Sequence, residues 1–315
     1  MPTKRPTKKI LILGLTGAGK GAVAFELAKR TGGQILSIDS MKVYRRMDIG
    51  TAKPPLNLRQ QVTYHMIDVV EPWDAFSAGR FVAQARPLIL DLEQRGIPLI
   101  AVGGTALYIK ALLYGIFDGP PADPTVRGQL HQRARTKGLE VLYAEIARVD
   151  PQAASRIHPT DLRRITRALE VYALTGRPIS SFQTQFDRQV DLADWAIVGL
   201  RRDRQDQAHR INARIKRMIE NGLLEEVKGL LADPRGMSPQ ARSAIGYAEV
   251  IDHIEGRIDL ERTIELIKRR TRRLAKAQRT WFKTFRFVQW LDVGADEPPD
   301  MTAQRILEST GLDQF

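Results

Sequence analysis

Residues 9–21, KILILGLTGAGKG, join an apolar run to a glycine-rich loop. Lys9 to Leu13 predict a buried strand, the glycines interrupt it, and the helix-forming residues Ala22 to Lys29 follow. The segment from Gly14 to Lys20 matches the pattern G-x-x-x-x-G-K, in which backbone N–H groups converge on phosphate oxygens and the lysine adds a positive charge. The stretch therefore predicts a phosphate-binding loop. Its candidate ligands are Gly14, Thr16, Gly17, Ala18, Gly19, Lys20 and Gly21.

The residue after the lysine departs from the pattern. A serine or threonine is expected there as a direct Mg²⁺ ligand, and this chain has Gly21. Magnesium would therefore be held by water, by phosphate and by other side chains, with Asp39 and Thr16 as candidates. The metal site itself stays unassigned.

Further strands and helices alternate after the loop. Gln34 to Ile38 predict a second strand that ends at Asp39, Phe76 to Gln94 a helix, and Pro98 to Val102 a third strand that ends at Thr105 in the sequence Gly-Gly-Thr. This alternation is typical of an α/β protein with a parallel sheet, here with a core like that of P-loop NTPases. Ligands of such sheets bind at the carboxyl ends of the strands, where Asp39 and Thr105 are expected.

The middle of the chain has a different character. Residues 119–124 form a turn-rich linker, and Val126 to Tyr172 follow a helical pattern with frequent arginine. Strand character returns from Trp195 to Leu200 and a helix is predicted from Arg204 to Glu220. We therefore predict a helical subdomain inserted into the core. The predicted segments are 1–117 and 195–315 for the core and 118–194 for the insertion, which we expect to contact RNA.

Composition limits the classes of function. The 315 residues carry 49 Lys plus Arg against 36 Asp plus Glu, a net charge of +13 that favours a polyanionic partner, although a basic surface kept for solubility stays open. The absence of cysteine excludes disulfides, thiolate catalysis and cysteine-ligated metals. No apolar stretch reaches the roughly 20 residues of a membrane helix, so we expect a cytoplasmic protein with no membrane partner.

The long helix predicted from Leu260 to Lys283 concentrates positive charge. Between Glu265 and Asp292 no acidic residue occurs, which favours contact with nucleic-acid phosphates. The basic residues expected on one face are Arg269, Arg272, Lys276, Arg279 and Lys283, and those of the opposing apolar stripe are Ile264, Ile267, Leu274 and Trp281.

Six motifs along the chain point to one family. The string from Asp39 to Pro54, DSMKVYRRMDIGTAKP, resembles the signature of tRNA dimethylallyltransferases, also called tRNA isopentenyltransferases. Further segments agree in the same order, and the resemblance covers residues 8–292. They are His65–Asp68 (HMID), Val102–Tyr108 (VGGTALY), Arg167–Tyr172 (RALEVY), Ala244–Tyr247 (AIGY) and Thr271–Lys276 (TRRLAK).

The resemblance implies a reaction and a set of catalytic residues. The family transfers a dimethylallyl group from its diphosphate to the exocyclic N6 amine of the adenine 3′-adjacent to the anticodon, and releases diphosphate. Lys20, Arg214 and Arg210 would then bind the diphosphate, with Thr105 close to the bond that breaks. Asp39 would accept the amine proton, with a carboxylate that holds Mg²⁺ through water as the competing role.

The resemblance also implies tRNA, through its anticodon stem-loop, as the macromolecular partner. The target adenine would be flipped out to expose its amine, and we expect the enzyme to be a monomer. The residues predicted to contact tRNA, those of the basic helix included, are Asp39, Ser40, Met41, Lys42, Thr105, Arg127, Arg163, Arg164, Arg167, Ser243, Gly246, Tyr247, Arg269, Arg272 and Lys276.

Some positions depart from the family pattern, and two other functions stay open. Lys42 replaces an expected glutamine, Ala106 stands where glycine is common, and Ala277 replaces an arginine. The first alternative is a nucleotide or small-molecule kinase that uses ATP in the same loop. The second is a basic RNA-binding protein whose phosphate loop has degenerated, as Gly21 would allow.

Overall fold

The computed structural model describes residues 9–117, 119–182, 192–285 and 287–311. The chain divides into two compact units. One combines residues 1–113 with 191–315 and is called the core unit; the other comprises residues 114–190 and is called the helical unit. Each is described by itself.

The core unit is built on a parallel sheet, as predicted. Six strands lie in the order β3-β2-β4-β1-β5-β6, and every neighbouring pair is parallel. Because the phosphate loop follows the inner strand β1, its neighbours β4 and β5 fix the start of that loop on both sides. The strands are β1 (Lys9–Gly14), β2 (Gln34–Ile38), β3 (Tyr64–His65), β4 (Leu99–Gly103), β5 (Trp195–Arg201) and β6 (Gln289–Asp292).

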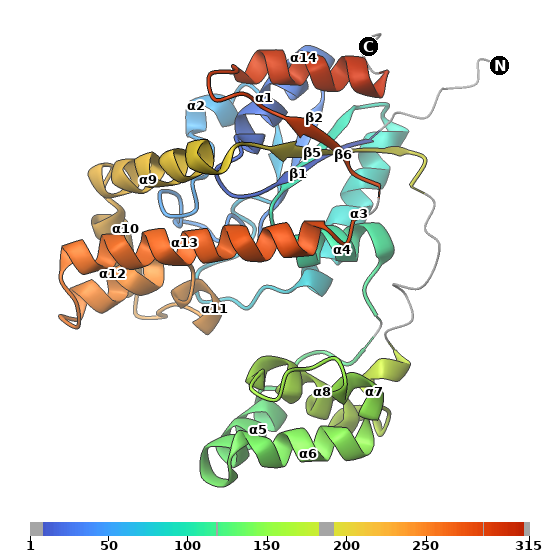
Figure 1. Ribbon diagram of the computed structural model, residues 1–315, viewed down its shortest axis with the longest axis vertical. Coiled ribbons are helices and arrows are strands. Elements are labelled where there is room, and N and C mark those ends of the chain that lie inside the picture. Colours follow the sequence, from blue (N-terminus) through green and yellow to red (C-terminus); the bar gives the residue numbers. More distant parts are fainter. Residues whose placement is uncertain (1–8, 118, 183–191, 286, 312–315) are drawn as a thin grey trace. The chain divides into compact units, whose positions relative to one another are not determined.

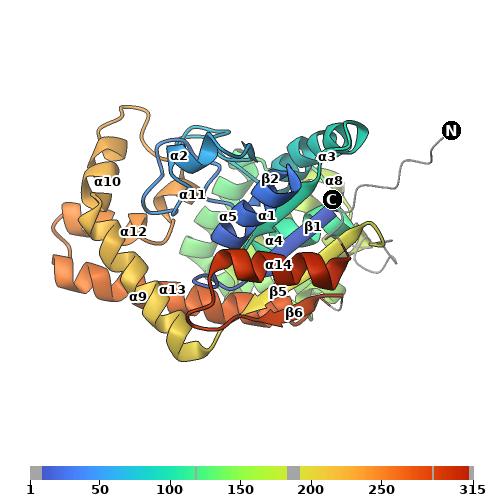
Figure 2. The same cartoon turned by 90° about the horizontal axis from the view of Figure 1, so that it is seen from above.

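Helices cover both faces of this sheet (Figures 1 and 2). Helices α1 and α14 lie on one face, where Leu27 and Ile306 pack with Ile12 of β1, and α4 and α13 lie on the other. None of the helices among the described residues is both long and apolar enough to cross a membrane. The helices of the core unit are α1 (Lys20–Thr31), α2 (Leu56–Arg59), α3 (Ala78–Gln94), α4 (Ala106–Tyr114), α9 (Arg204–Glu220), α10 (Leu223–Leu231), α11 (Pro239–Arg242), α12 (Tyr247–Ile254), α13 (Leu260–Phe282) and α14 (Pro299–Thr310).

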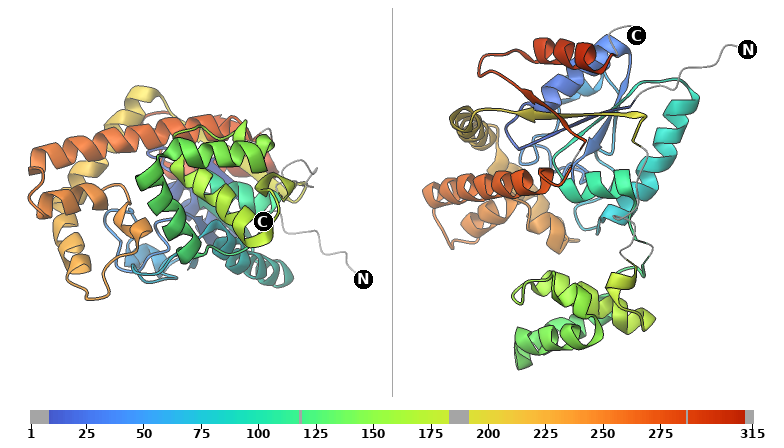
Figure 3. Two further views of the ribbon diagram at one scale, coloured as in Figure 1. Left: turned by 90° about the horizontal axis from the view of Figure 1, so that it is seen from below. Right: turned by 45° about the vertical axis from the view of Figure 1, so that its right-hand side comes forward.

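The helical unit is built from helices (Figure 3) and has its own apolar core. Its helices are α5 (Pro124–Lys137), α6 (Leu139–Val149), α7 (Pro151–Ala154) and α8 (Leu162–Thr175), with a 3₁₀ turn at Ile179–Ser181. Leu142, Ile146 and Ile165 have no exposed surface and lie at the centre of this core. Asp123 caps α5, since its carboxylate accepts hydrogen bonds from the Thr125 and Val126 N–H groups.

The buried side of α13 differs from the predicted apolar stripe. Leu274 is 41% exposed, whereas the line that faces the protein combines the apolar Ile267 and Phe282 with small and polar side chains. The prediction was therefore wrong for Leu274 and is confirmed for Ile267, because the buried line passes through residues three or four positions apart that do not include Leu274. The buried residues are Thr263, Ile267, Thr271, Ala275, Gln278 and Phe282.

Candidate functional site

The predicted phosphate loop connects β1 to α1. Gly19 is the N-cap of α1 and has a φ of 88°, a left-handed conformation that glycine adopts without steric cost. Gly21 lies in the first turn of α1, and no atom lies within 4 Å of where a Cβ would be. The loop thus places helix N–H groups at the carboxyl end of β1, which suits an anion.

Lys20 lies in this loop in an environment that disfavours its charge. Its Nζ donates a hydrogen bond to the Leu15 carbonyl oxygen at 2.8 Å. Burial, together with the positive charges of Arg214 and Lys42 and against the opposing effect of Asp39, lowers the pKa of the Lys20 ammonium to about 7. An incoming anion would supply the missing negative charge.

Arg214 of α9 meets the phosphate loop directly. Its Nη2 donates to the Thr16 hydroxyl at 2.9 Å, and burial lowers the pKa of its guanidinium. Arg210, one turn earlier, instead has its Nε 3.9 Å from an Asp206 carboxylate oxygen and is 38% exposed. The structure therefore brings Arg214, and not Arg210, to the loop, and the diphosphate contact of Arg210 stays a prediction.

Asp39 and Thr105 lie at the carboxyl ends of neighbouring strands, as predicted. The Asp39 carboxylate accepts hydrogen bonds from the N–H groups of Met41 at 2.8 Å and Lys42 at 3.2 Å. The Thr105 hydroxyl accepts one from the Ser40 N–H at 3.1 Å. Residues 39–42 and the loop after β4 are thus tied together.

Lys42, which departs from the family pattern, adds a cation beside Asp39. Burial lowers the pKa of its ammonium, the Asp39 carboxylate opposes that decrease, and Arg214 and Lys53 reinforce it. Lysine and arginine charges therefore outnumber the single carboxylate of Asp39 at this edge of the sheet. Such an excess of positive charge is a candidate site for an anion with more than one negative charge.

Two glutamines that were not predicted as site residues also contact the loop. The Gln278 Oε1 of α13 accepts a hydrogen bond from the Thr16 N–H at 2.8 Å, and the Gln207 Nε2 of α9 donates to the Thr16 carbonyl at 2.8 Å. Gln278 belongs to the family's Lys-Arg-Gln string, in which this chain has Ala277 in place of arginine, and that string gave no indication of the contact with the loop; for Gln207 there was no signal.

A cavity of about 470 Å³ lies beside Arg214. Its wall combines apolar side chains such as Ile49 and Met218 with the cations Arg214 and Arg217. Lys53 and Arg59 also line it, paired with the carboxylates of Asp48 and Asp68. This combination suits a molecule with one apolar and one anionic end.

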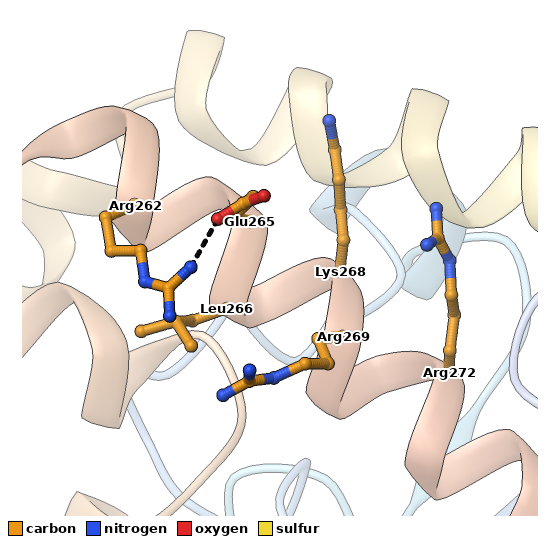
Figure 4. Close-up of a pocket in the computed structure, with 6 residues that line it drawn as sticks. All are labelled: Arg262, Glu265, Leu266, Lys268, Arg269 and Arg272. Carbon is orange, nitrogen blue, oxygen red and sulfur yellow. Dashed lines mark hydrogen bonds and ion pairs between the residues drawn. The ribbon is translucent and has the colours of Figure 1, made fainter.

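The outer surface of α13 is basic, as predicted, and its cations do not all point the same way. Lys268 and Arg272 extend on one side of the helix, whereas Arg269 points away from both (Figure 4). Arg272 donates to the Asn212 Oδ1 at 3.1 Å, and Arg269 and Lys276 are exposed. A hollow of about 230 Å³ on this surface is lined by Arg262, Glu265, Leu266, Lys268, Arg269 and Arg272.

The arginines predicted to contact tRNA in the helical unit fall into two pairs. Arg127 and Arg167 both bind the fully buried Glu170 carboxylate, with distances of 2.8 Å from Arg127 Nε and 2.6 Å from Arg167 Nη1. Arg163 and Arg164 are exposed and carry their charges at the surface. The first pair is tied to a buried carboxylate, although the Arg127 side chain is 41% exposed, and the second is accessible to a partner. The tRNA contacts of all four arginines stay predictions.

The predicted contacts near α12 are mostly buried. Tyr247 has no exposed surface, and its hydroxyl donates to the Glu226 carboxylate at 2.5 Å. The Gly246 N–H donates to Glu249 at 2.7 Å, whereas Ser243 is exposed. In this arrangement Ser243 can reach a partner, and Tyr247 supports the packing of α12.

The described residues contain no group of three or more histidine and acidic side chains that could hold a metal ion. Of the two candidate magnesium ligands, the Thr16 hydroxyl already accepts a hydrogen bond from Arg214. One Asp39 oxygen accepts from two N–H groups. The second Asp39 oxygen could face a hydrated cation, and one carboxylate together with phosphate oxygens is a common donor set for Mg²⁺.

Comparisons with known sequences agree with this geometry. The family model for IPP transferase matches residues 42–285, and that for isopentenyl transferase matches residues 7–66. A tRNA dimethylallyltransferase 2 from Geotalea uraniireducens is 45% identical over 287 residues, 90% of this chain and 92% of the relative. A tRNA dimethylallyltransferase from Geobacillus thermodenitrificans is 44% identical over 91% of this chain and 90% of its own.

Solved structures give the same result. The full-length tRNA isopentenylpyrophosphate transferase of Bacillus halodurans superposes with a TM-score of 0.66 at 36% identity, over 98% of this chain and 100% of that one. A eukaryotic dimethylallyltransferase acting on tRNA superposes with a TM-score of 0.77 at 26% identity, over 96% of this chain and 79% of that one.

Proposed function

Because this chain belongs to the IPP transferase family, we propose that it transfers the dimethylallyl group of dimethylallyl diphosphate to the N6 amine of the adenine 3′-adjacent to the anticodon of tRNA. The N6–C1 bond forms, the C1–O bond to diphosphate breaks, and the amine loses one proton. The observation that carries the proposal is the meeting of Lys20, Arg214 and Asp39 at one edge of the sheet.

The leaving group explains the excess of cations. An adenine amine is a weak nucleophile, so the allylic C–O bond must loosen early and charge accumulates on the diphosphate. Fixed donors aimed at that charge stabilise the transition state. Lys20 and Arg214, supported by Lys42, are suited to this task because burial makes their charges costly until an anion arrives.

We propose Asp39 as the base that takes the amine proton. Two backbone N–H groups fix one carboxylate oxygen, which leaves the other to meet the adenine. Thr105 holds the Ser40 N–H and so keeps this segment against the loop after β4. The proton thus passes to a carboxylate whose orientation is set by its own backbone.

Magnesium is part of the proposal as a cofactor of the diphosphate. Holding this ion through water is the competing role for the free oxygen of Asp39, and the charge of the ion would neutralise phosphate oxygens when bound. Gly21 supplies no direct ligand. Because Lys20 and Arg214 also neutralise diphosphate charge, the lack of a direct metal ligand at residue 21 is consistent with the reaction.

Two surfaces suit the substrates. The cavity beside Arg214 combines apolar and cationic walls, as an isoprenyl diphosphate requires. The exposed cations of α13, with Arg163 and Arg164 of the helical unit, are candidates for tRNA phosphates. We further propose that the enzyme acts as a monomer.

Labelled dimethylallyl diphosphate and unmodified tRNA test the proposal. We expect label in tRNA that depends on an adenine next to the anticodon. A parallel reaction with labelled ATP covers the kinase alternative, which predicts phosphoryl transfer. Binding of tRNA without transfer of either label would support the RNA-binding alternative and contradict the proposed activity.

A further inference from the structure

Gln278 joins two segments of the proposed diphosphate site. Its Oε1 accepts from the Thr16 N–H of the phosphate loop at 2.8 Å, and its Nε2 donates to the Gly104 carbonyl at 2.9 Å, next to Thr105. Only one orientation of the side-chain amide satisfies both partners. The side chain is 8% exposed, so water does not readily replace either bond.

The approach to Gly104 is close. A Cβ at that position would lie 2.6 Å from the Gln278 Nε2, so a side chain on residue 104 would push the amide away from its present place. The contact therefore depends on both residues, on the side-chain amide of Gln278 and on the absence of a Cβ at Gly104.

The other polar groups of Thr16 are also bound. Its carbonyl accepts from Gln207 of α9, and its hydroxyl accepts from Arg214 of the same helix. Thr16 thus has its N–H, carbonyl and hydroxyl groups fixed by side chains from α9 and α13. Because its N–H is already bound to Gln278, Thr16 shapes the phosphate loop and leaves phosphate contact to the N–H groups closer to α1.

We infer that Gln278 is a positioning residue that sets the separation between the phosphate loop and the Gly104–Thr105 loop, and thereby the affinity for the diphosphate. The inference rests on the proposed function. The residue touches no substrate and acts through the two backbone groups that it binds. A shift of either loop would move Lys20 or Thr105 relative to the same diphosphate, and proximity effects are sensitive to about 1 Å.

Gln278→Met tests this directly, because methionine has a similar length and lacks the amide. We expect the Km for dimethylallyl diphosphate and the inhibition constant of inorganic diphosphate to rise roughly tenfold, with the affinity for tRNA within twofold of wild type. Gln207→Met should act in the same direction, since it frees the Thr16 carbonyl.

The matched control is Leu274→Ala, on the exposed side of the same helix, which should leave both affinities unchanged. If Gln278→Met does not fold, Gln207→Met carries the test, because it removes a second restraint on Thr16 without adding a charge. Unchanged diphosphate affinity in folded variants, or a parallel loss of diphosphate and tRNA affinity, would overturn the inference. If wild-type protein binds inorganic diphosphate but transfers no prenyl group, the proposed function fails while this test stands.

Discussion

Two groups of cations in this protein have opposite electrostatic settings. At the phosphate loop, Lys20, Lys42 and Arg214 share the single carboxylate of Asp39, and burial lowers the pKa of all three. In the helical unit, four N–H groups surround one buried carboxylate, since Glu170 accepts two hydrogen bonds from Arg127 and one each from Arg167 and the Asp123 N–H. Three buried cations share one carboxylate in the first group, whereas in the second both arginines bind the carboxylate directly and one net positive charge remains.

This difference distinguishes cations that are suited to bind a ligand from cations that stabilise the fold. A buried cation without a partner is costly, so its persistence indicates a ligand that supplies the charge. Arginines around a buried glutamate need no such ligand, because each guanidinium already has a hydrogen-bonded partner. Frequent arginine in the sequence therefore predicts a basic protein, while the position of the carboxylates decides which arginines remain for RNA.

At the phosphate loop, we expect the largest effect from removing the charge of Asp39. Asp39→Asn keeps an oxygen for the Met41 and Lys42 N–H groups but cannot accept the amine proton. We expect kcat to fall by about 10² to 10⁴, with tRNA affinity within several-fold of wild type. Single-turnover prenyl transfer measures the first and filter binding the second. Unchanged turnover would exclude Asp39 as the base.

The corresponding change in the helical unit is Glu170→Gln. It leaves Arg127 and Arg167 without their shared charge, and we expect a loss of about 2 kcal/mol in the unfolding free energy of that unit. Amide hydrogen exchange of α5 and α8 measures it. The control Arg164→Ala breaks an exposed pair with Asp161, 3.3 Å apart, and should change stability by less than about 0.5 kcal/mol.

The Glu170 cluster should make the helical unit less stable at acid pH. Burial raises the pKa of its carboxyl, and the hydrogen bonds from Arg127 and Arg167 outweigh this, so the folded pKa lies below the usual value. The stabilisation is therefore present above the unfolded pKa of about 4.3 and is lost as the pH falls through the folded value. Glu170→Gln should lose this acid-sensitive component. An identical acid response would contradict the assignment.

Much of the core unit could be predicted because its signals are local. The apolar run at β1 and the glycine loop determine strand, turn and helix within a few residues, and the predicted strands ending at Asp39 and Thr105 are present. Strands β3 and β6 are too short for a clear alternation of apolar and polar residues, and they form by pairing with β2 and β5 at the two edges of the sheet. They were not predicted.

The contacts that complete the site are not local. Gln278 meets Thr16 across 262 positions of sequence, and Gln207 meets it across 191. No pattern of spacing or hydropathy encodes such a pair. Tyr247 and Arg127 show the reverse case: the motif drew attention to them, and only the structure gives their partners, Glu226 and Glu170.

A smaller effect is expected from the titration of Lys20. Because its pKa is about 7, the Lys20 ammonium is already charged in the free protein below pH 7. Above pH 7 the lysine is neutral in the free protein, so diphosphate binding must be accompanied by the uptake of a proton. Affinity for inorganic diphosphate should therefore fall by up to about tenfold per pH unit above pH 7. Lys20→Arg should bind with a flatter profile, because arginine stays charged. Calorimetry in two buffers of different ionisation enthalpy gives the proton uptake.

The smallest effect distinguishes free from neutralised arginines in RNA binding. Replacing Arg269, Arg272 and Lys276 of α13 by alanine should lower the slope of log Kd for tRNA against log salt by about 2, because each phosphate contact contributes roughly 0.7 to 0.9. Arg127→Ala, whose guanidinium makes two hydrogen bonds to Glu170, should change the slope by well under half a contact. Equal changes per arginine at both places would mean that the internal carboxylate does not withdraw Arg127 from the RNA, and the distinction between the two groups of cations would be lost.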